Sequence, residues 1–243
     1  MTRPAHQAEP LCQALEDEGA TVIRLPLIEI EALDSPALPN TQDYDWLIFT
    51  SPNAVHLGLA GLGQIDSKIA AVGAATARAL KLAGQDDVVI PTRDYSSEGL
   101  LACEDFMQPA GQQVLLIKGE GGRDLITSTL RERGALVTER VVYQRHALNP
   151  KPDSIVTAIK QAHSVIATSL EILQSLVESC PAQVLPQLQA LQLVVPSERV
   201  VKRARGLGFR AVHCVESPLT EKALVQALQN LQPASASSGQ RHE

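Results

Sequence analysis

The chain has 243 residues, 44% of them hydrophobic and 20% charged, which is ordinary globular composition and a length that suits two domains. No apolar run approaches the roughly 18–20 residues of a membrane span, and residues 1–25 lack a signal peptide, so we expect no membrane association and a cytoplasmic location. The net charge of −6, without a basic block, argues against nucleic acid as a partner. The four scattered cysteines argue against a disulfide framework or a zinc site.

Short apolar, β-branched runs alternate with amphipathic stretches along the whole chain. The predicted strands are Thr21–Leu25, Trp46–Phe49, Ile69–Val72, Val88–Ile90, Val114–Ile117, Val137–Tyr143, Ser164–Ala167, Leu191–Val195 and Ala211–Val215. The predicted helices are Ala8–Glu18, Ala54–Leu62, Ala74–Ala83, Glu98–Glu104, Leu125–Arg133, Pro152–Ala162, Leu170–Glu178, Glu198–Gly206 and Thr220–Leu231. This alternation predicts an α/β protein with parallel sheets covered by helices on both faces.

Part of this pattern occurs twice, with an offset of about 115–124 residues. For example, Leu47–Ser51 resembles Val165–Ser169. The order of the units predicts a discontinuous α/β domain and a second α/β domain inserted into it, joined by two proline-bearing linkers. We expect the discontinuous domain to comprise residues 1–33 and 147–231, the inserted domain 36–145, and a disordered tail 232–243.

The two copies differ at their first strand. The second copy has Val114–Ile117 before the turn Lys118-Gly119, whereas the first copy begins at Met1, directly beside the turn Thr2-Arg3-Pro4. Either a strand is missing from this version of the sequence, or another segment fills its place, since unpaired central strands are costly. We favour the missing strand.

Hydroxyl groups, amides and a few cations cluster at the turns after the predicted strands, where ligands bind in open α/β sheets. Each Ser or Thr taken singly is most simply an N-cap, but together such turns suit a ligand with several carboxylates or phosphates. The run Gly119–Arg123 lacks the sixth glycine of a dinucleotide site and the ending of a P-loop. It is either a turn that receives a carboxylate or a structural loop.

Catalytic motifs are few. The sequence has neither HExxH nor GxSxG, and its six histidines share no element. Tyr143 ends a predicted strand where the chain passes back from the inserted domain to the discontinuous one. It is either an aromatic that packs in the core or a residue whose hydroxyl faces a cleft between the two domains.

The turns, taken in order, resemble those of the uroporphyrinogen-III synthase family. The resemblance lies in Leu47–Val55, Ala71–Gly73 with Thr76 and Leu80, Tyr95–Leu100, Lys118–Leu125, Val142–Arg145, Thr168-Ser169, and Glu216–Pro218 with Thr220. It implies two flavodoxin-like domains with the substrate between them, and no metal or organic cofactor. It also implies a cyclising hydro-lyase of porphyrin and haem biosynthesis. Such an enzyme converts hydroxymethylbilane, a linear tetrapyrrole with eight carboxylates, into uroporphyrinogen III with loss of water and inversion of the last ring.

The resemblance also suggests roles for particular residues. Tyr143, and second to it Thr220, are candidates for helping hydroxide to leave. The candidate contacts to substrate carboxylates are Arg3, Ser51, Asn53, Ser97, Lys118, Arg123, Thr168, Ser169, Ser197 and Arg199. We expect a monomer that makes at most a transient contact with hydroxymethylbilane synthase.

Two other classes of protein stay open at this point. A hinged two-domain binding protein for a small polycarboxylate would share the α/β lobes, but needs export. A nucleotide- or S-adenosylmethionine-dependent enzyme, such as a tetrapyrrole methyltransferase, needs a glycine-rich cofactor loop that the sequence does not show.

Overall fold

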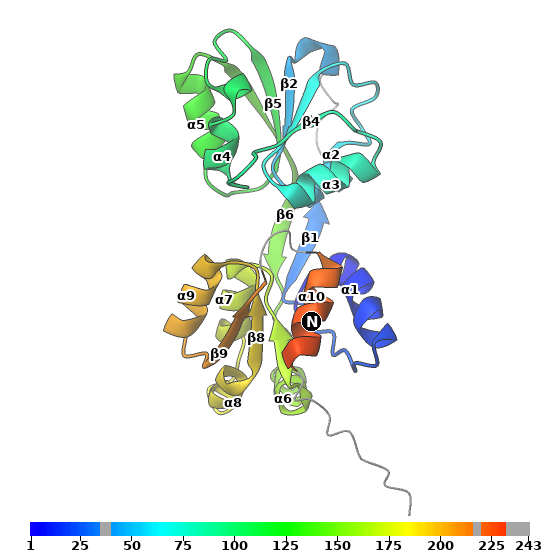
Figure 1. Cartoon of the computed structure of the whole chain (residues 1–243), viewed down its shortest axis with the longest axis vertical. Helices are drawn as coiled ribbons and strands as arrows, with labels where there is room; N and C mark the ends of the chain where they lie inside the picture. Colours follow the sequence, from blue (N-terminus) through cyan, green and yellow to red (C-terminus); the bar gives the residue numbers. More distant parts are fainter. Residues whose placement is uncertain (35–39, 216–219, 232–243) are drawn as a thin grey trace, which may run out of the picture. The chain divides into compact units, whose positions relative to one another are not determined.

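The structure is a computed structural model that describes residues 1–34, 40–215 and 220–231. Residues 35–39 between the two expected domains, Glu216–Pro218 of the last motif and the expected tail 232–243 lie outside the described residues. The chain divides into two compact units, one of Met1–Glu29 with Ala147–Glu243, and one of Ile30–His146 (Figure 1). We call them the discontinuous unit and the inserted unit.

The inserted unit is built on a six-stranded sheet in the order β1-β6-β5-β2-β3-β4. The strands are β1 (Ile28–Ala32), β2 (Trp46–Phe49), β3 (Lys68–Ala71), β4 (Val88–Val89), β5 (Gln113–Gly119) and β6 (Leu136–Ala147). The pairs from β6 to β4 are all parallel, which confirms the predicted α/β class. Hydrogen bonds from Leu33 to Val142 and from Leu148 to Leu27 show that the chain at the edge strand β1 runs antiparallel to β6.

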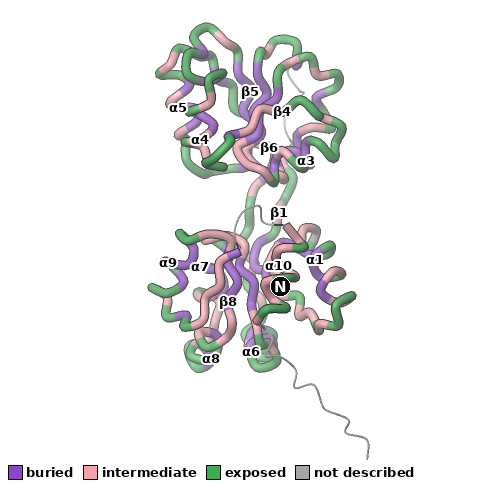
Figure 2. Tube along the Cα trace, in the orientation of Figure 1, coloured by how far each residue is buried: buried purple, intermediate pink, exposed green. Residues whose placement is uncertain are grey.

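Helices cover both faces of this sheet (Figure 1). The helices are α2 (Pro52–Gly58), α3 (Ala74–Leu82), α4 (Ser97–Leu101) and α5 (Leu125–Glu132). Successive side chains of a strand point to opposite faces, so Leu47 and Phe49 pack with α2 and α3, whereas Trp46 and Ile48 pack with α4 and α5. The result is two apolar layers, one on each face of the sheet. Figure 2 colours much of β5 as buried.

The strand order of the inserted unit places a switch point between β5 and β2. The chain continues from β5 to β6 on one side of the sheet, and from β2 to β3 on the other. If β5, β6, β2, β3 and β4 are numbered 1 to 5, their order across the sheet is 2-1-3-4-5, which is the flavodoxin-like order. The edge strand β1 is additional, and the chain enters this arrangement at β2, its third strand.

The discontinuous unit has a three-stranded parallel sheet in the order β7-β8-β9. Its strands are β7 (Ser164–Ile166), β8 (Gln192–Val195) and β9 (Ala211–Cys214). Its helices are α1 (Ala5–Asp17), α6 (Pro152–Gln161), α7 (Leu170–Glu178), α8 (Leu185–Ala190), α9 (Glu198–Gly206) and α10 (Glu221–Leu231). Helix α8 was not predicted.

The predicted strand Thr21–Leu25 is wrong as a regular strand. This segment instead lies beside Met1 and Thr2, whose carbonyl oxygens accept hydrogen bonds from Leu25 at 2.8 Å and from Leu27 at 3.3 Å. The Thr2 hydroxyl also donates to the carbonyl oxygen of Ile166 at 2.5 Å, at the end of β7. The Thr2 contact therefore sets the start of the chain beside β7, much as β5 lies beside β2.

Among the described residues, no helix combines the length and the apolar character needed to cross a bilayer.

The loop before α4 allows no side chain at Gly99, because a Cβ there would lie 1.8 Å from the carbonyl oxygen of Asp94. Gly99→Ala is therefore expected to lower the free energy of unfolding by about 1–3 kcal/mol, measured by urea denaturation. Gly206→Ala, also at a helical glycine but with open space around it, is the control and should stabilise by up to about 1 kcal/mol. Equal effects of the two substitutions would contradict the close approach of loop and helix.

Candidate functional site

The carboxyl ends of β2 and β5 meet at the switch point of the inserted unit. β2 runs into Thr50 and Ser51, and β5 ends at Gly119. In open α/β sheets the crevice at such a point is where ligands bind, because helix N-termini there present unpaired N–H groups.

Ser51 is the N-cap of α2. Its Oγ accepts a hydrogen bond from the Ala54 N–H at 3.1 Å, and Pro52 occupies the first helical position, where it needs no hydrogen bond. Asn53 lies one residue further along the first turn, and both Ser51 and Asn53 are half-buried. The sequence Thr-Ser-Pro-Asn thus combines a hydroxyl, an amide side chain and a helix N-terminus at one place.

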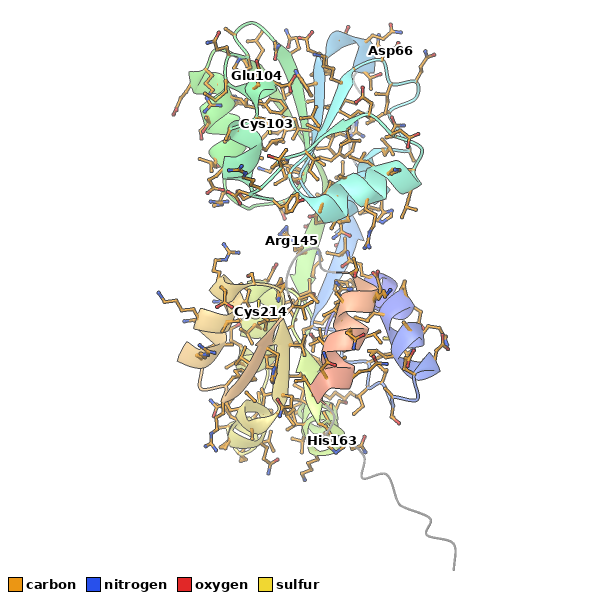
Figure 3. All side chains as sticks on the ribbon, viewed as in Figure 1. Asp66, Cys103, Glu104, Arg145, His163 and Cys214 are labelled. Atoms are coloured by element: carbon orange, nitrogen blue, oxygen red, sulfur yellow. The ribbon has the colours of Figure 1, made fainter. Side chains whose placement is uncertain are left out.

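Tyr143 lies against the same switch point from β6. Its hydroxyl is 3.0 Å from Ser51 Oγ, and Arg145 Nη2 donates to it at 3.4 Å. The Arg145 guanidinium also lies 5.4 Å from the centre of the Tyr143 ring; Figure 3 labels this arginine on β6. The ring is only 1% exposed, so the hydroxyl faces Ser51 from inside the core.

Gly119 makes this position of the ring possible. A Cβ at residue 119 would lie 2.4 Å from Tyr143 Cζ and 2.7 Å from its hydroxyl oxygen. The strand register shifts between Lys118 and Gly119, which sets Gly119 opposite Tyr143.

Lys118 and Arg123, two predicted contacts, are bound to carboxylates. Lys118 is buried, with its ammonium 3.3 Å from Glu139 and 3.6 Å from Asp124. It precedes Gly119 on β5 and therefore points to the other face of the sheet from Tyr143. Arg123 is exposed and binds Glu98 through two contacts of 2.5 and 2.9 Å, which lower the pKa of Glu98 to about 2.

Ser97, a further predicted contact, is the first residue of α4. The cap of that helix is Ser96, whose Oγ accepts from the Gly99 N–H at 3.1 Å. The structure does not join Ser97, Lys118 or Arg123 to the Ser51–Tyr143 pair by any hydrogen bond between described residues.

The predicted residues of the discontinuous unit gather at the equivalent edge of its own sheet. Arg3 Nε donates to Thr168 Oγ1 at 3.3 Å, directly after β7, and the next residue, Ser169, caps α7 by accepting from Ile172 at 3.1 Å. Ser197 is the N-cap residue of α9, after β8, and Arg199 is exposed on its first turn. Thr220 accepts from the Ala223 N–H at 3.1 Å at the start of α10.

Two features of the site were not predicted. Arg145 was noted only as a neighbour of Tyr143, and Gly119 only as part of a turn. Gly119 and Tyr143 both stand at or just beyond the ends of predicted strands, which was the only signal that they could lie close together. The register shift that sets them opposite one another is not visible in the sequence.

A hollow of about 450 Å³ lies at the opposite edge of the inserted unit's sheet, at the amino ends of β2, β3 and β5. Its lining residues are Gln42, Tyr44, Asp45, Trp46, Asp66, Ser67, Lys68 and Gln112; Figure 3 labels Asp66. Two aspartates face one lysine there, so this hollow suits an anion less well than the switch point. Among the residues that the structure describes, no three His, Cys, Asp or Glu side chains come together as a metal site.

The fold defines a two-unit α/β protein in which serines precede helices α2, α7 and α9, with Arg145 beside Tyr143 in one unit and Arg3 beside Thr168 in the other. The model of the family described as Uroporphyrinogen-III synthase HemD matches residues 9–226. The uroporphyrinogen-III synthase of Escherichia coli strain K12 is 32% identical over 94% of this chain and 98% of its own. That of Synechococcus elongatus is 36% identical over 67% of this chain and 66% of its own.

The fold agrees with these sequence matches. A solved structure of a uroporphyrinogen III synthase mutant from the extremely thermophilic bacterium Thermus thermophilus covers 93% of this chain and 96% of its own with a TM-score of 0.59, at 22% identity. The chain belongs to the uroporphyrinogen-III synthase family.

The ion pair between buried Lys118 and the partly exposed carboxylate of Glu139 makes stability depend on pH. The Thr127 hydroxyl and the Lys118 ammonium both donate to Glu139 and hold the pKa of its carboxyl below the ordinary value. Because the folded-state pKa is depressed, the stabilisation is complete above the unfolded-state pKa of about 4.3 and is lost as the pH falls through the folded-state pKa. Glu139→Gln should therefore cost about 1–2 kcal/mol at pH 7, and progressively less below about pH 4.

Urea denaturation of both proteins between pH 7 and pH 3 measures this difference. Glu132→Gln, at an exposed glutamate of α5, is the control and should stay within about 0.5 kcal/mol of the parent at every pH. A difference between parent and Glu139→Gln that stays constant down to pH 3 would refute the assignment.

Proposed function

We propose that this chain converts hydroxymethylbilane into uroporphyrinogen III, as a cyclising hydro-lyase. The observation that carries the proposal is the family match over residues 9–226, which runs through both units. The match favours this enzyme over a hinged polycarboxylate-binding protein.

The chemistry at the carboxyl ends of the strands in both units supports the proposal. The substrate carries eight carboxylates, while the protein has a net charge of −6, so local positive potential must overcome overall repulsion. The N-termini of α2, α7 and α9, each preceded by a serine, supply N–H groups and the positive end of a helix dipole. Arg3 adds a guanidinium beside Thr168.

The reaction needs positioning more than strong acid–base groups. The free bilane loses hydroxide and closes unaided to the wrong isomer, so the enzyme has to select the conformation in which the substituted carbon of the last ring meets the electrophilic methylene. In the proposal, Arg3, Ser51, Asn53, Ser97, Thr168, Ser169, Ser197 and Arg199 hold the substrate. Lys118 and Arg123, already bound to carboxylates, act as more distant positive charges. Tyr143, and second to it Thr220, assist the departure of hydroxide.

The proposal takes the enzyme to be a cytoplasmic monomer with at most transient contact to hydroxymethylbilane synthase, as the sequence led us to expect.

The direct test supplies freshly prepared hydroxymethylbilane to the purified chain and separates the product isomers after oxidation to porphyrins. Isomer III is expected as the main product, whereas a reaction without protein gives isomer I. Isomer I alone in both reactions would overturn the proposal.

Arg3 is expected to act mainly in binding. Arg3→Gln removes one charge-assisted contact and should raise KM about tenfold, with kcat changed less than about threefold. Arg24→Gln, which removes an arginine bound to Glu9 and Glu16 in the same unit, is the matched control and should leave KM unchanged. The two variants carry the same change in net charge, so an equal rise in KM would point to overall charge rather than to a contact of Arg3.

A further inference from the structure

We propose that Ser51 is the hydroxyl that meets the leaving group of the substrate, and that Tyr143 acts from behind it as a proton relay. In this arrangement Gly119 and Arg145 are positioning residues for Tyr143. The inference rests on the proposed function and assigns the acid within that site.

The hydrogen bonds around the two oxygens support one direction of donation. The Ala54 N–H and the Arg145 guanidinium can only donate, the first to Ser51 Oγ and the second to the Tyr143 oxygen. If Ser51 donated to Tyr143, the tyrosine proton would be left without a partner inside the core, at a cost of about 1–3 kcal/mol. If Tyr143 donates to Ser51, the tyrosine proton has a partner and the Ser51 proton is left for a ligand.

The exposure of the two residues agrees with this direction. Tyr143 is 1% exposed and belongs to an apolar cluster with Ile117, Val142 and Val55, all within the inserted unit. Ser51 is half-buried at the N-terminus of α2, on the switch point where the fold places its ligand. A substrate can therefore reach the serine hydroxyl, but not the phenol.

The chain carries this arrangement in one unit only. Its three tyrosines, Tyr44, Tyr95 and Tyr143, all lie within residues 30–146. Ser169, the counterpart of Ser51 in the discontinuous unit, caps its helix at the same 3.1 Å. It follows Thr168, which binds Arg3, and the discontinuous unit contains no tyrosine. In this proposal residues of both units bind the substrate, but only the inserted unit carries the serine–tyrosine relay.

The proton movements balance. The carbon–oxygen bond of the hydroxymethyl group breaks as the pyrrole nitrogen lone pair forms the conjugated methylene electrophile. The leaving oxygen takes the Ser51 proton and departs as water, and Ser51 takes the proton of Tyr143. The phenolate is stabilised by Arg145. When the last ring has closed and regains its aromaticity, the proton it releases restores Tyr143 through Ser51.

Single-turnover rates of isomer III formation test the relay in wild type, Ser51→Ala, Tyr143→Phe and the double variant. Each single substitution should slow the reaction by about tenfold or more. Because both residues act in one path, the double variant should be no more than about threefold slower than Ser51→Ala, whereas independent roles multiply the two losses. The wild-type solvent isotope effect should report two protons in flight, and that of Tyr143→Phe only one.

Ser96→Ala is the control for loss of an N-cap, since Ser96 caps α4 with the same 3.1 Å hydrogen bond in the same unit. It should lower stability about as much as Ser51→Ala, with the rate within about twofold of wild type. A full rate in Ser51→Ala, or multiplied losses in the double variant, would overturn the relay. Failure of the wild type to form isomer III would instead overturn the proposed function, so the two failures are distinguishable.

Discussion

The parallel pairing of β2 with β5 is the constraint on which the site depends. It brings the carboxyl end of each strand to one edge of the sheet, although the two are far apart in sequence. Both strands are almost wholly buried, so their register is fixed by the apolar layers on each face. This register sets the end of β2 beside the end of β5, and the shifted register of β5 with β6 places Gly119 opposite Tyr143. The edge where we propose that the substrate binds therefore follows from the same packing that stabilises the unit.

Much of this architecture could be predicted from the alternation of apolar runs and amphipathic stretches. The strand Trp46–Phe49 was predicted with its observed bounds, because its four residues are buried on both faces and read as one apolar run. The serines at helix starts were predictable as well, since a Ser before Pro or an apolar turn is a strong N-cap signal. Ser51 and Ser169 both have that role.

The positions that could not be predicted from the sequence are those that depend on contacts between elements far apart in the chain. Lys118 follows an apolar strand and reads as a cation in a turn, yet β5 extends through Gly119 and sends Lys118 to the face that holds Glu139. Tyr143 is buried because Gly119 leaves room for its ring, which depends on a register shift. The run Thr21–Leu25 has the composition of a strand, but it forms no regular strand; its end is bound to Met1 by the hydrogen bond from Leu25.

The most direct test of where the substrate binds is NMR of the ¹⁵N-labelled chain during titration with a stable bilane analogue that lacks the leaving hydroxyl. The account predicts that the amide signals of Ala54, Gly119 and Thr168 shift together and saturate at one ligand concentration, because helix N-termini and strand ends at the carboxyl edges receive the carboxylates. Shifts confined to Asp45, Asp66 and Gln112, at the amino edge of the inserted unit's sheet, would contradict it.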